Sequence, residues 1–264
     1  MSNHDIPVVI FCGGEGTRMR GGTLTKKELV EIGGRPIIWH VMRIYSAHGF
    51  SKFILPLGYE AGQLRRYFLD YEAMTRDFTV RLGNHNDNIN FRGPEEHPEW
   101  EVSLVDTGLL TDKASRIARV TDYLTADRFC VTYGDGVADV DLGALMEFHR
   151  AHGKLVTITA IQPRHYQYGT VEAGPDGQVR EYIQYPELPY WINAGFMVFE
   201  RAVLDHISPG DHAALETGLL QDLIAGGELM MYRHHGFWQS MDTLKDANDL
   251  EKAWTNGAPW KIWT

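Results

Sequence analysis

Short apolar segments alternate with amphipathic helical patterns along the first 162 residues, and this alternation restricts the fold more than any other property of the sequence. Buried strands separated by helices predict a mostly parallel central sheet flanked by helices, an α/β fold. The predicted strands are "VVIFC", "KFILPLG", "EVSLVD", "RFCVTYGD" and "KLVTITAIQ". The predicted helices are "PIIWHVMRIYSAHG", "AGQLRRYFLDYEAM" and "LGALMEFHRAHG".

Strand-like segments dominate after residue 162. "YGTVEA", "QVREYIQ" and "INAGFMVFE" predict antiparallel additions over the sheet in the C-terminal half, and "TLKDANDLEKAW" predicts a closing helix. Because no repeat or obvious linker interrupts the chain, we expect a single domain over residues 1–264, with parts 1–162 and 163–264. The irregular stretch at 83–100 is interpreted either as a flexible excursion or as a contact between copies in a homo-oligomer.

Composition excludes several classes of protein. The net charge is −10 with a pI near 5.6, which argues against binding to nucleic acid or to anionic membranes. No run approaches the roughly 18 apolar residues of a membrane-spanning helix. The N-terminus "MSNHDIPVVIF" lacks the pattern of a signal peptide, so we expect a cytoplasmic enzyme. Cys12 and Cys130 lie in apolar strand-like runs and are predicted to be buried thiols.

A glycine-rich loop follows the first predicted strand in "VVIFCGGEGTRMRGG". A dinucleotide fingerprint would need a glycine where Met19 stands, and no Gly-Lys-Ser/Thr ending of a P-loop follows. Glycines nevertheless let the backbone approach a base and a triphosphate closely, and Arg18, Lys26 and Lys27 supply cationic donors nearby. The residues alone leave two interpretations open, an anion-binding loop or an ordinary turn from strand to helix.

Two aspartates are candidate ligands for a metal. Asp135 follows a predicted parallel strand between two glycines, where open sheets of this kind bind ligands, and its carboxylate suits magnesium. Asp242 precedes the last predicted helix. The alternatives are a turn aspartate at Asp135 and a helix N-cap at Asp242 or Thr243. Asp139 and Asp141 are predicted to be turn and helix-cap residues.

The chain resembles the glucose-1-phosphate cytidylyltransferases, a branch of the sugar-phosphate nucleotidyltransferases, over nearly its whole length. The resemblance is carried by "GGEGTRM", "LVEIGGRPIIWHVMRIYSAHGF", "SLVDTG", "FCVTYGDGVADVD", "HGKLVTITAIQP", "WINAGF" and "YRHHGFWQSMDTLKD". It implies a Rossmann-like nucleotidyltransferase fold, Mg²⁺ as cofactor, and transfer of CMP from CTP to a phosphorylated acceptor with release of pyrophosphate. The acceptor phosphate is already ionised near neutral pH, so cations and a metal are needed more than a general base.

The same resemblance implies a role for each matching residue. Residues 1–162 would bind the nucleotide and 163–264 the acceptor, with Arg18 and Lys27 as catalytic cations and Asp135 with Asp242 holding the metal. The nucleotide-binding residues would be Gly13, Gly14, Gly16, Thr17, Thr107 and Gly108. The acceptor-binding residues would be Arg164, Tyr168, Gly169, Gln184, Tyr185 and Asn193.

One stretch departs from the family pattern. Where the family has "EKP" ahead of "WINGGF", with a glutamate for sugar hydroxyls and a lysine for the acceptor phosphate, this chain has Gln184, Tyr185 and Pro186. Arg164 and its neighbours His165 and Tyr166 either replace the lost phosphate contact or are surface loop residues. The family's "KPKP" is also altered, to "TKKE", which keeps one lysine, Lys27, in register.

Three functions therefore remain as hypotheses. The first is cytidylyl transfer to a sugar 1-phosphate, with glucose 1-phosphate as the family default. The second is cytidylyl transfer to a non-hexose phosphate, phosphonate or phosphoramidate, favoured by the loss of the glutamate and lysine. The third is an inactive nucleotide-binding regulator, against which the retained metal and phosphate ligands argue.

Overall fold

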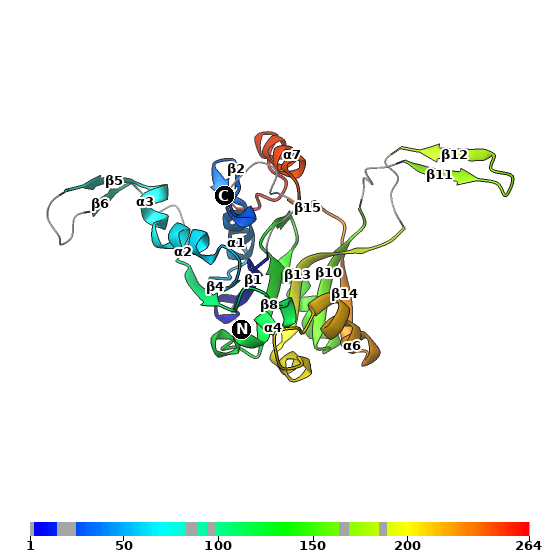
Figure 1. Ribbon diagram of the computed structural model, residues 1–264, viewed down its shortest axis with the longest axis horizontal. Helices are drawn as coiled ribbons and strands as arrows, with labels where there is room; N and C mark the ends of the chain where they lie inside the picture. Colours follow the sequence, from blue (N-terminus) through cyan, green and yellow to red (C-terminus); the bar gives the residue numbers. More distant parts are fainter. Residues whose placement is uncertain are drawn as a thin grey trace.

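The computed structural model describes residues 3–14, 25–82, 89–93, 99–163, 169–184 and 189–263. Its centre is a seven-stranded sheet with the strand order β14-β10-β13-β8-β1-β4-β7 (Figure 1). The strands are β1 (Val8–Phe11), β4 (Lys52–Leu57), β7 (Glu101–Asp106), β8 (Arg128–Tyr133), β10 (Val156–Ile161), β13 (Ile192–Glu200) and β14 (Leu229–His234). Each strand predicted before residue 162 is confirmed, and so is the mostly parallel α/β fold class.

The sheet is parallel except around β13. β1 pairs in parallel with β4 and β8, β4 with β7, and β10 with β14. β13 pairs antiparallel with β8 on one side and β10 on the other. The expected antiparallel addition is thus present, but β13 lies within the sheet and not over it. Its six consecutive buried residues, 194–199, suit a strand that is covered on both faces.

Helices cover both faces of the sheet (Figure 1). One face packs against α1 (Ile37–Ala47), α5 (Leu142–His152) and α7 (Leu244–Thr255), and the other against α4 (Lys113–Arg119) and α6 (Leu220–Ala225). Side chains alternate along a strand, so β1 contributes to both cores. Val8 and Ile10 pack in the first core, while Val9 and Phe11 pack in the second.

Local sequence explains where several helices begin and end. α5 begins at the N-cap Asp141, whose side chain accepts a hydrogen bond from Ala144 N, and ends at Gly153 with φ of +65°. The predicted helix over 61–74 forms two helices, α2 (Ala61–Leu69) and α3 (Tyr71–Thr75), separated at Asp70. Aspartate favours helix ends over helix interiors, which accounts for the break.

Short elements connect these layers. They are η1 (Asn3–Asp5), η3 (Lys27–Leu29), β2 (Glu31–Ile32), β3 (Arg35–Pro36), η4 (Thr121–Tyr123), β9 (Gly136–Ala138), η5 (Arg201–His206), η6 (Leu215–Leu219) and β15 (Trp238–Ser240). β9 pairs antiparallel with β15, so that Ser240 lies opposite Gly136. This pairing brings the segment before α7 next to the segment after β8.

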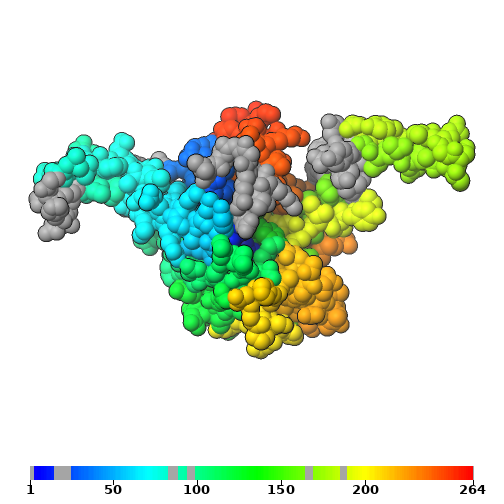
Figure 2. Space-filling model, viewed as in Figure 1, coloured from blue at the N-terminus to red at the C-terminus, as the bar shows by residue number. Residues whose placement is uncertain are grey.

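Two hairpins extend from opposite sides of the body (Figures 1 and 2). The first pairs β5 (Asp77–Val80) with β6 (Ile89–Arg92), and the second pairs β11 (Thr170–Ala173) with β12 (Val179–Ile183). The stretch 83–100, expected to be irregular, therefore contains a strand at 89–92. Nearly every residue in the four strands of these hairpins is exposed.

Cys12 and Cys130 are buried free thiols, as predicted. Within the described ranges, every helix is too short or too polar to cross a membrane.

Candidate active site

The carboxyl ends of β1 and β8 lie side by side, because these strands pair in parallel with Phe11 opposite Tyr133. Gly13 and Gly14 continue from β1, and Asp135 follows β8. Asp242 reaches the same place from the far end of the chain, through the pairing of β15 with β9 and a hydrogen bond from Met241 N to the Asp135 carbonyl at 2.8 Å. The β9–β15 pair thereby joins two residues that are far apart in the sequence.

Lys27 is the centre of this cluster. Its Nζ lies 2.6 Å from Asp135 Oδ2 and 2.8 Å from Asp242 Oδ1. Burial alone lowers the pKa of Lys27, but the charges and hydrogen bonds of the two carboxylates outweigh burial and raise it. The ammonium is therefore fixed in its charged form between two anions, and its side chain is only 12% exposed.

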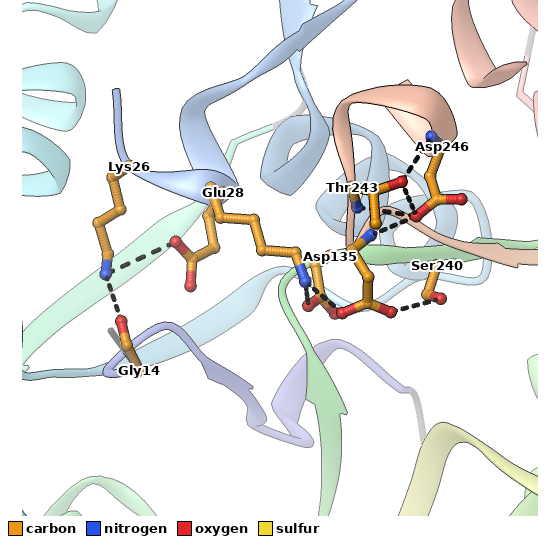
Figure 3. Close-up of polar contacts among 9 residues, drawn as sticks. Gly14, Lys26, Glu28, Asp135, Ser240, Thr243 and Asp246 are labelled. Carbon is orange, nitrogen blue, oxygen red and sulfur yellow. Dashed lines mark hydrogen bonds and ion pairs between the residues drawn. The ribbon is translucent and has the colours of Figure 1, made fainter. Parts of the chain in front are cut away.

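A helix cap fixes the orientation of Asp242. The N-cap of α7 is Thr243, which forms a capping box with Asp246 (Figure 3). Asp246 Oδ2 also accepts a hydrogen bond from Asp242 N at 3.0 Å, and Ser240 Oγ donates to Asp242 Oδ2 at 3.0 Å. Because Thr243 serves as the cap, the Asp242 carboxylate is available to Lys27.

The donor set fits a magnesium ion that arrives together with phosphate groups. Asp135 and Asp242 direct carboxylate oxygens to one point, and Lys27 supplies the compensating positive charge there. No group of three or more His, Cys, Asp or Glu with metal-binding geometry occurs among the described residues. Magnesium often takes only one or two carboxylates and completes its shell with phosphate oxygens and water.

Lys26 supports the glycine loop from within. It is 4% exposed, and its Nζ donates to Tyr59 O at 2.9 Å. The same Nζ donates to Gly14 O at 3.4 Å (Figure 3). Glu28 Oε2 lies 3.6 Å from the same ammonium. Burial raises the pKa of Glu28 to about 7, despite the opposing effect of Lys26. Adjacent lysines thus have different partners: Lys26 binds two carbonyl oxygens and pairs with Glu28, whereas Lys27 binds Asp135 and Asp242.

The glycines of the loop are needed for different reasons. A Cβ on Gly13 would lie 2.4 Å from the guanidinium carbon of Arg116, so packing within the protein already requires glycine there. A Cβ on Gly14 would meet no described atom within 4 Å. Packing against the described residues therefore requires glycine at position 13 but not at position 14. Gly16, Thr17 and Arg18 lie outside the described residues.

Thr107 and Gly108 follow β7 at the same edge of the sheet. Thr107 is fully buried, and its hydroxyl donates to Leu57 O at 2.8 Å and accepts from Arg116 at 2.7 Å. Gly108 has φ of +86°, and its N–H donates to Asp106 Oδ1 at 3.0 Å. The Thr107 side chain therefore organises the loop from inside, and the backbone carbonyls of Thr107 and Gly108 accept hydrogen bonds from Arg119 and Arg116.

The nucleotidyl transferase family profile matches residues 7–256 of the chain. This chain belongs to the nucleotidyl transferase family. Glucose-1-phosphate cytidylyltransferase of Salmonella typhimurium (strain LT2) is 42% identical over 259 residues, which cover 97% of this chain and 98% of that protein. Mannose-1-phosphate guanylyltransferase of Mycobacterium tuberculosis is 30% identical over 254 residues, covering 93% of this chain and 64% of that protein.

Solved structures agree on the fold. The crystal structure of HddC from Yersinia pseudotuberculosis has a TM-score of 0.66 and 18% sequence identity, covering 94% of this chain and 99% of that one. At this identity the likeness concerns the fold alone. The resemblance to the cytidylyltransferase branch rests on the sequence relatives, and they confirm it.

Of the predicted acceptor residues, the structure of this nucleotidyl transferase describes Gly169, Gln184 and Asn193, and these lie on two different elements. Asn193 lies on β13, and its Nδ2 donates to the Tyr133 hydroxyl at 3.3 Å. Tyr133 stands two positions before Asp135 in the sequence. Gln184 and Gly169 both adjoin Tyr182 on the β11–β12 hairpin: the Tyr182 hydroxyl donates to Gln184 Oε1 at 2.7 Å and would crowd a Cβ on Gly169. Arg164, Tyr168 and Tyr185 lie outside the described residues.

Sequence reasoning missed some residues that shape the site. Asp246 had a usable signal, because "TLKD" has a threonine followed three positions later by an acidic residue, a pattern close to a capping box. Arg116 had none, since nothing in "KASRIAR" indicates that one arginine turns inward.

Proposed function

We propose that this nucleotidyl transferase joins CMP from CTP to glucose 1-phosphate and releases pyrophosphate. The observation that carries the proposal is the Lys27 ammonium held between Asp135 and Asp242 at the carboxyl ends of the strands. Support for the substrates comes from the relatives: identity is 42% to a glucose-1-phosphate cytidylyltransferase and 30% to a mannose-1-phosphate guanylyltransferase.

The chain's task in this reaction is to position two anions that repel each other. The ionised acceptor phosphate attacks the α-phosphorus of CTP in line, and the pyrophosphate leaves on the opposite side. Lys27 and Arg18 are the proposed cations that stabilise the spread charge. Gly13, Gly14 and Gly16 would let the loop backbone approach the nucleotide.

Asp135 and Asp242 are the residues that would hold Mg²⁺. When bound, the ion supplies positive charge to the phosphate oxygens of the nucleotide. The Lys27 ammonium, which lies beside both carboxylates, would bind a phosphate oxygen. Ser240 holds the Asp242 carboxylate in place, and Asp246 holds the Asp242 backbone N–H.

A homo-oligomer in the cytoplasm completes the proposal. A two-stranded hairpin is only marginally stable alone in water, so we expect further contacts for both hairpins. Support comes from their exposed apolar side chains: Phe78, Val80 and Ile89 on one, and Val171, Val179, Tyr182 and Ile183 on the other. The cytoplasmic location is inferred because CTP is an intracellular metabolite.

A different phosphorylated acceptor is the second candidate, because Gln184 stands where the family has a glutamate and its Oε1 is occupied by the Tyr182 hydroxyl. The test is pyrophosphate release from CTP, UTP, GTP, ATP and dTTP, each with glucose 1-phosphate, mannose 1-phosphate, a small phosphonate and a phosphoramidate. We expect the highest kcat/KM for CTP with glucose 1-phosphate. A higher kcat/KM with a non-sugar acceptor would support the second candidate, and no release with any pair would support the inactive regulator.

A further inference from the structure

Glu216 lies in η6, a π-helical turn whose two buried leucines anchor it in the core on the α4 side of the sheet. Its Oε1 accepts a hydrogen bond from the Tyr133 hydroxyl at 2.9 Å and another from Lys113 Nζ. Turns of this kind are rare and occur frequently at functional sites. The Glu216 carboxylate thus connects η6 to the end of β8, two positions before Asp135.

The ionisation of these groups determines the direction of each hydrogen bond. Burial acts to raise the pKa of Glu216, but the hydrogen bond and the charge of Lys113 outweigh burial and lower it. Burial also raises the pKa of Tyr133, and the charge of Glu216 acts in the same direction. The carboxylate is therefore ionised and the phenol keeps its proton. The Tyr133 hydroxyl donates this proton to Glu216, and its oxygen accepts from Asn193 Nδ2 at 3.3 Å.

The oxygen of the Asn193 amide is fixed by the backbone. Asn193 Oδ1 accepts a hydrogen bond from Gly195 N at 3.0 Å. Gly195 has φ of +78°, and a Cβ there would lie 3.0 Å from the Tyr133 ring, so this position requires glycine. The amide oxygen and one N–H are thus both engaged. The second N–H of Nδ2 has no hydrogen-bond partner among the described residues and is left to contact a ligand.

Glu216 determines which group the Asn193 amide offers to that ligand. An asparagine side chain carries both donors and an acceptor, and rotation of the amide by half a turn exchanges them. If the Tyr133 hydroxyl turned its proton toward Asn193, the amide would rotate and offer its oxygen. Because Glu216 takes that proton, the amide offers an N–H. An N–H recognises an oxygen that can accept, such as that of a sugar hydroxyl or a phosphate.

We infer that Glu216 is a positioning residue for the acceptor, because through the Tyr133 hydroxyl it keeps the Asn193 amide in the orientation that donates to an acceptor oxygen. This inference rests on the proposed function, since it assumes that the phosphorylated acceptor binds beside Asn193. Lys113 supports the arrangement: it pairs with Glu216, and its Nζ lies 5.0 Å from the centroid of the Tyr133 ring. Glu216 acts through Tyr133 and needs no contact with substrate.

The test compares Glu216→Ala with Glu228→Ala as a matched control. Glu228 also pairs with a lysine, Lys154 at 3.1 Å, but it lies directly before β14, at the opposite end of the sheet. For Glu216→Ala we expect KM for the acceptor to rise about tenfold, while kcat and KM for CTP change less than about threefold. Glu228→Ala should leave all three values unchanged.

Two further variants distinguish this role from a structural one. Tyr133→Phe removes the hydroxyl between Glu216 and Asn193, so it should raise KM for the acceptor to the same extent. The double variant with Glu216→Ala should be no worse than either single variant, because both changes interrupt the same chain of hydrogen bonds. Glu216→Gln keeps an oxygen that can accept from Tyr133, and its KM for the acceptor should stay within about threefold of wild type.

Three results would overturn the inference. They are a near wild-type KM for the acceptor in folded Glu216→Ala, additive losses in the double variant, and an equal loss in kcat and both KM values, which indicates general destabilisation. The wild-type control separates the two proposals. If the wild type prefers another acceptor, the proposed function fails, and the same split in KM with that acceptor still supports Glu216. If the wild type prefers glucose 1-phosphate and Glu216→Ala behaves like it, only the role of Glu216 fails.

Discussion

The cluster around Lys27 and the β11–β12 hairpin carry different halves of the proposed site, and they are built in opposite ways. Around Lys27 the functional groups are partly buried and held by several contacts each, and the supporting residues Lys26 and Arg116 are only 4% and 5% exposed. On the hairpin every residue of β12 is exposed, and Gln184 contacts its neighbour Tyr182. The fold therefore organises the proposed nucleotide half in advance, whereas part of the proposed acceptor half lies on an exposed hairpin, for which we expect low local stability.

The largest effect should come from the two carboxylates. Replacing Asp135 or Asp242 with Asn should lower kcat by about a thousandfold, because each supplies charge to the metal and not packing. Asp141→Asn is the matched control, since asparagine is an equally good N-cap for α5. Steady-state kinetics at saturating magnesium checks this, with circular dichroism to verify the fold. A variant with near wild-type kcat would remove that aspartate from the site.

Lys27→Ala should lower kcat by about a hundredfold, because an oriented charge at the transition state is worth a few kcal/mol. Lys52→Ala is its control, an ion-paired lysine whose Nζ lies 3.2 Å from Asp5 at the opposite end of the sheet. Equal kinetics for the two alanine variants would contradict the role of Lys27.

Two glycines of the loop, Gly13 and Gly14, can be compared within the proposed nucleotide half of the site. Gly14→Val should weaken CTP binding by at least about tenfold, measured by calorimetry, with no change in Tm, because a Cβ there meets no described atom within 4 Å. Gly13→Ala should instead lower Tm by several degrees, since its Cβ collides with Arg116. Unchanged CTP affinity in Gly14→Val would show that the loop is not the nucleotide site.

More of the fold than of the candidate site could be predicted from the sequence. Strands β1, β4, β7, β8 and β10 were readable because each is a continuous apolar run between turn residues, and Asp135 was readable from its place after such a run. The central position of β13 could not be predicted, because an apolar run does not show which strands will pair with it. The buried position of Arg116 could not be predicted either, because the sequence of a short helix does not show which carbonyl oxygens will surround one arginine.

Glu28 provides a pH-dependent test of the buried half. Burial raises its pKa from 4.5 to about 7, so between these values the folded protein binds more protons than the unfolded chain. Stability from this group is therefore lost as pH rises through that window, by roughly 1 kcal/mol per pH unit. The Glu28→Gln variant does not lose this stability as pH rises. The free energy of unfolding of the variant minus that of wild type should therefore increase from pH 5 to pH 7.5. Denaturant titrations at several pH values measure the difference, and parallel curves would refute the assignment.

The smallest effect is expected on the hairpin side. Gln184→Glu combined with Tyr185→Lys restores the family's pair, and it should raise kcat/KM for glucose 1-phosphate by a few-fold, at about constant KM for CTP. Arg164→Ala should weaken binding of the acceptor more than binding of CTP. If the double variant loses activity, this chain holds its acceptor by other residues, and the contrast between the two halves becomes sharper.

The most direct test of nucleotidyl transfer at this site follows the phosphorus atoms of CTP. Wild type and Lys27→Ala are incubated with glucose 1-phosphate and magnesium, using CTP labelled with ³²P at either the α or the γ position. We predict that α label appears in CDP-glucose and γ label only in pyrophosphate, with both signals strongly reduced in the variant. Label from the γ position on the sugar, or equal α transfer by both proteins, would contradict the account.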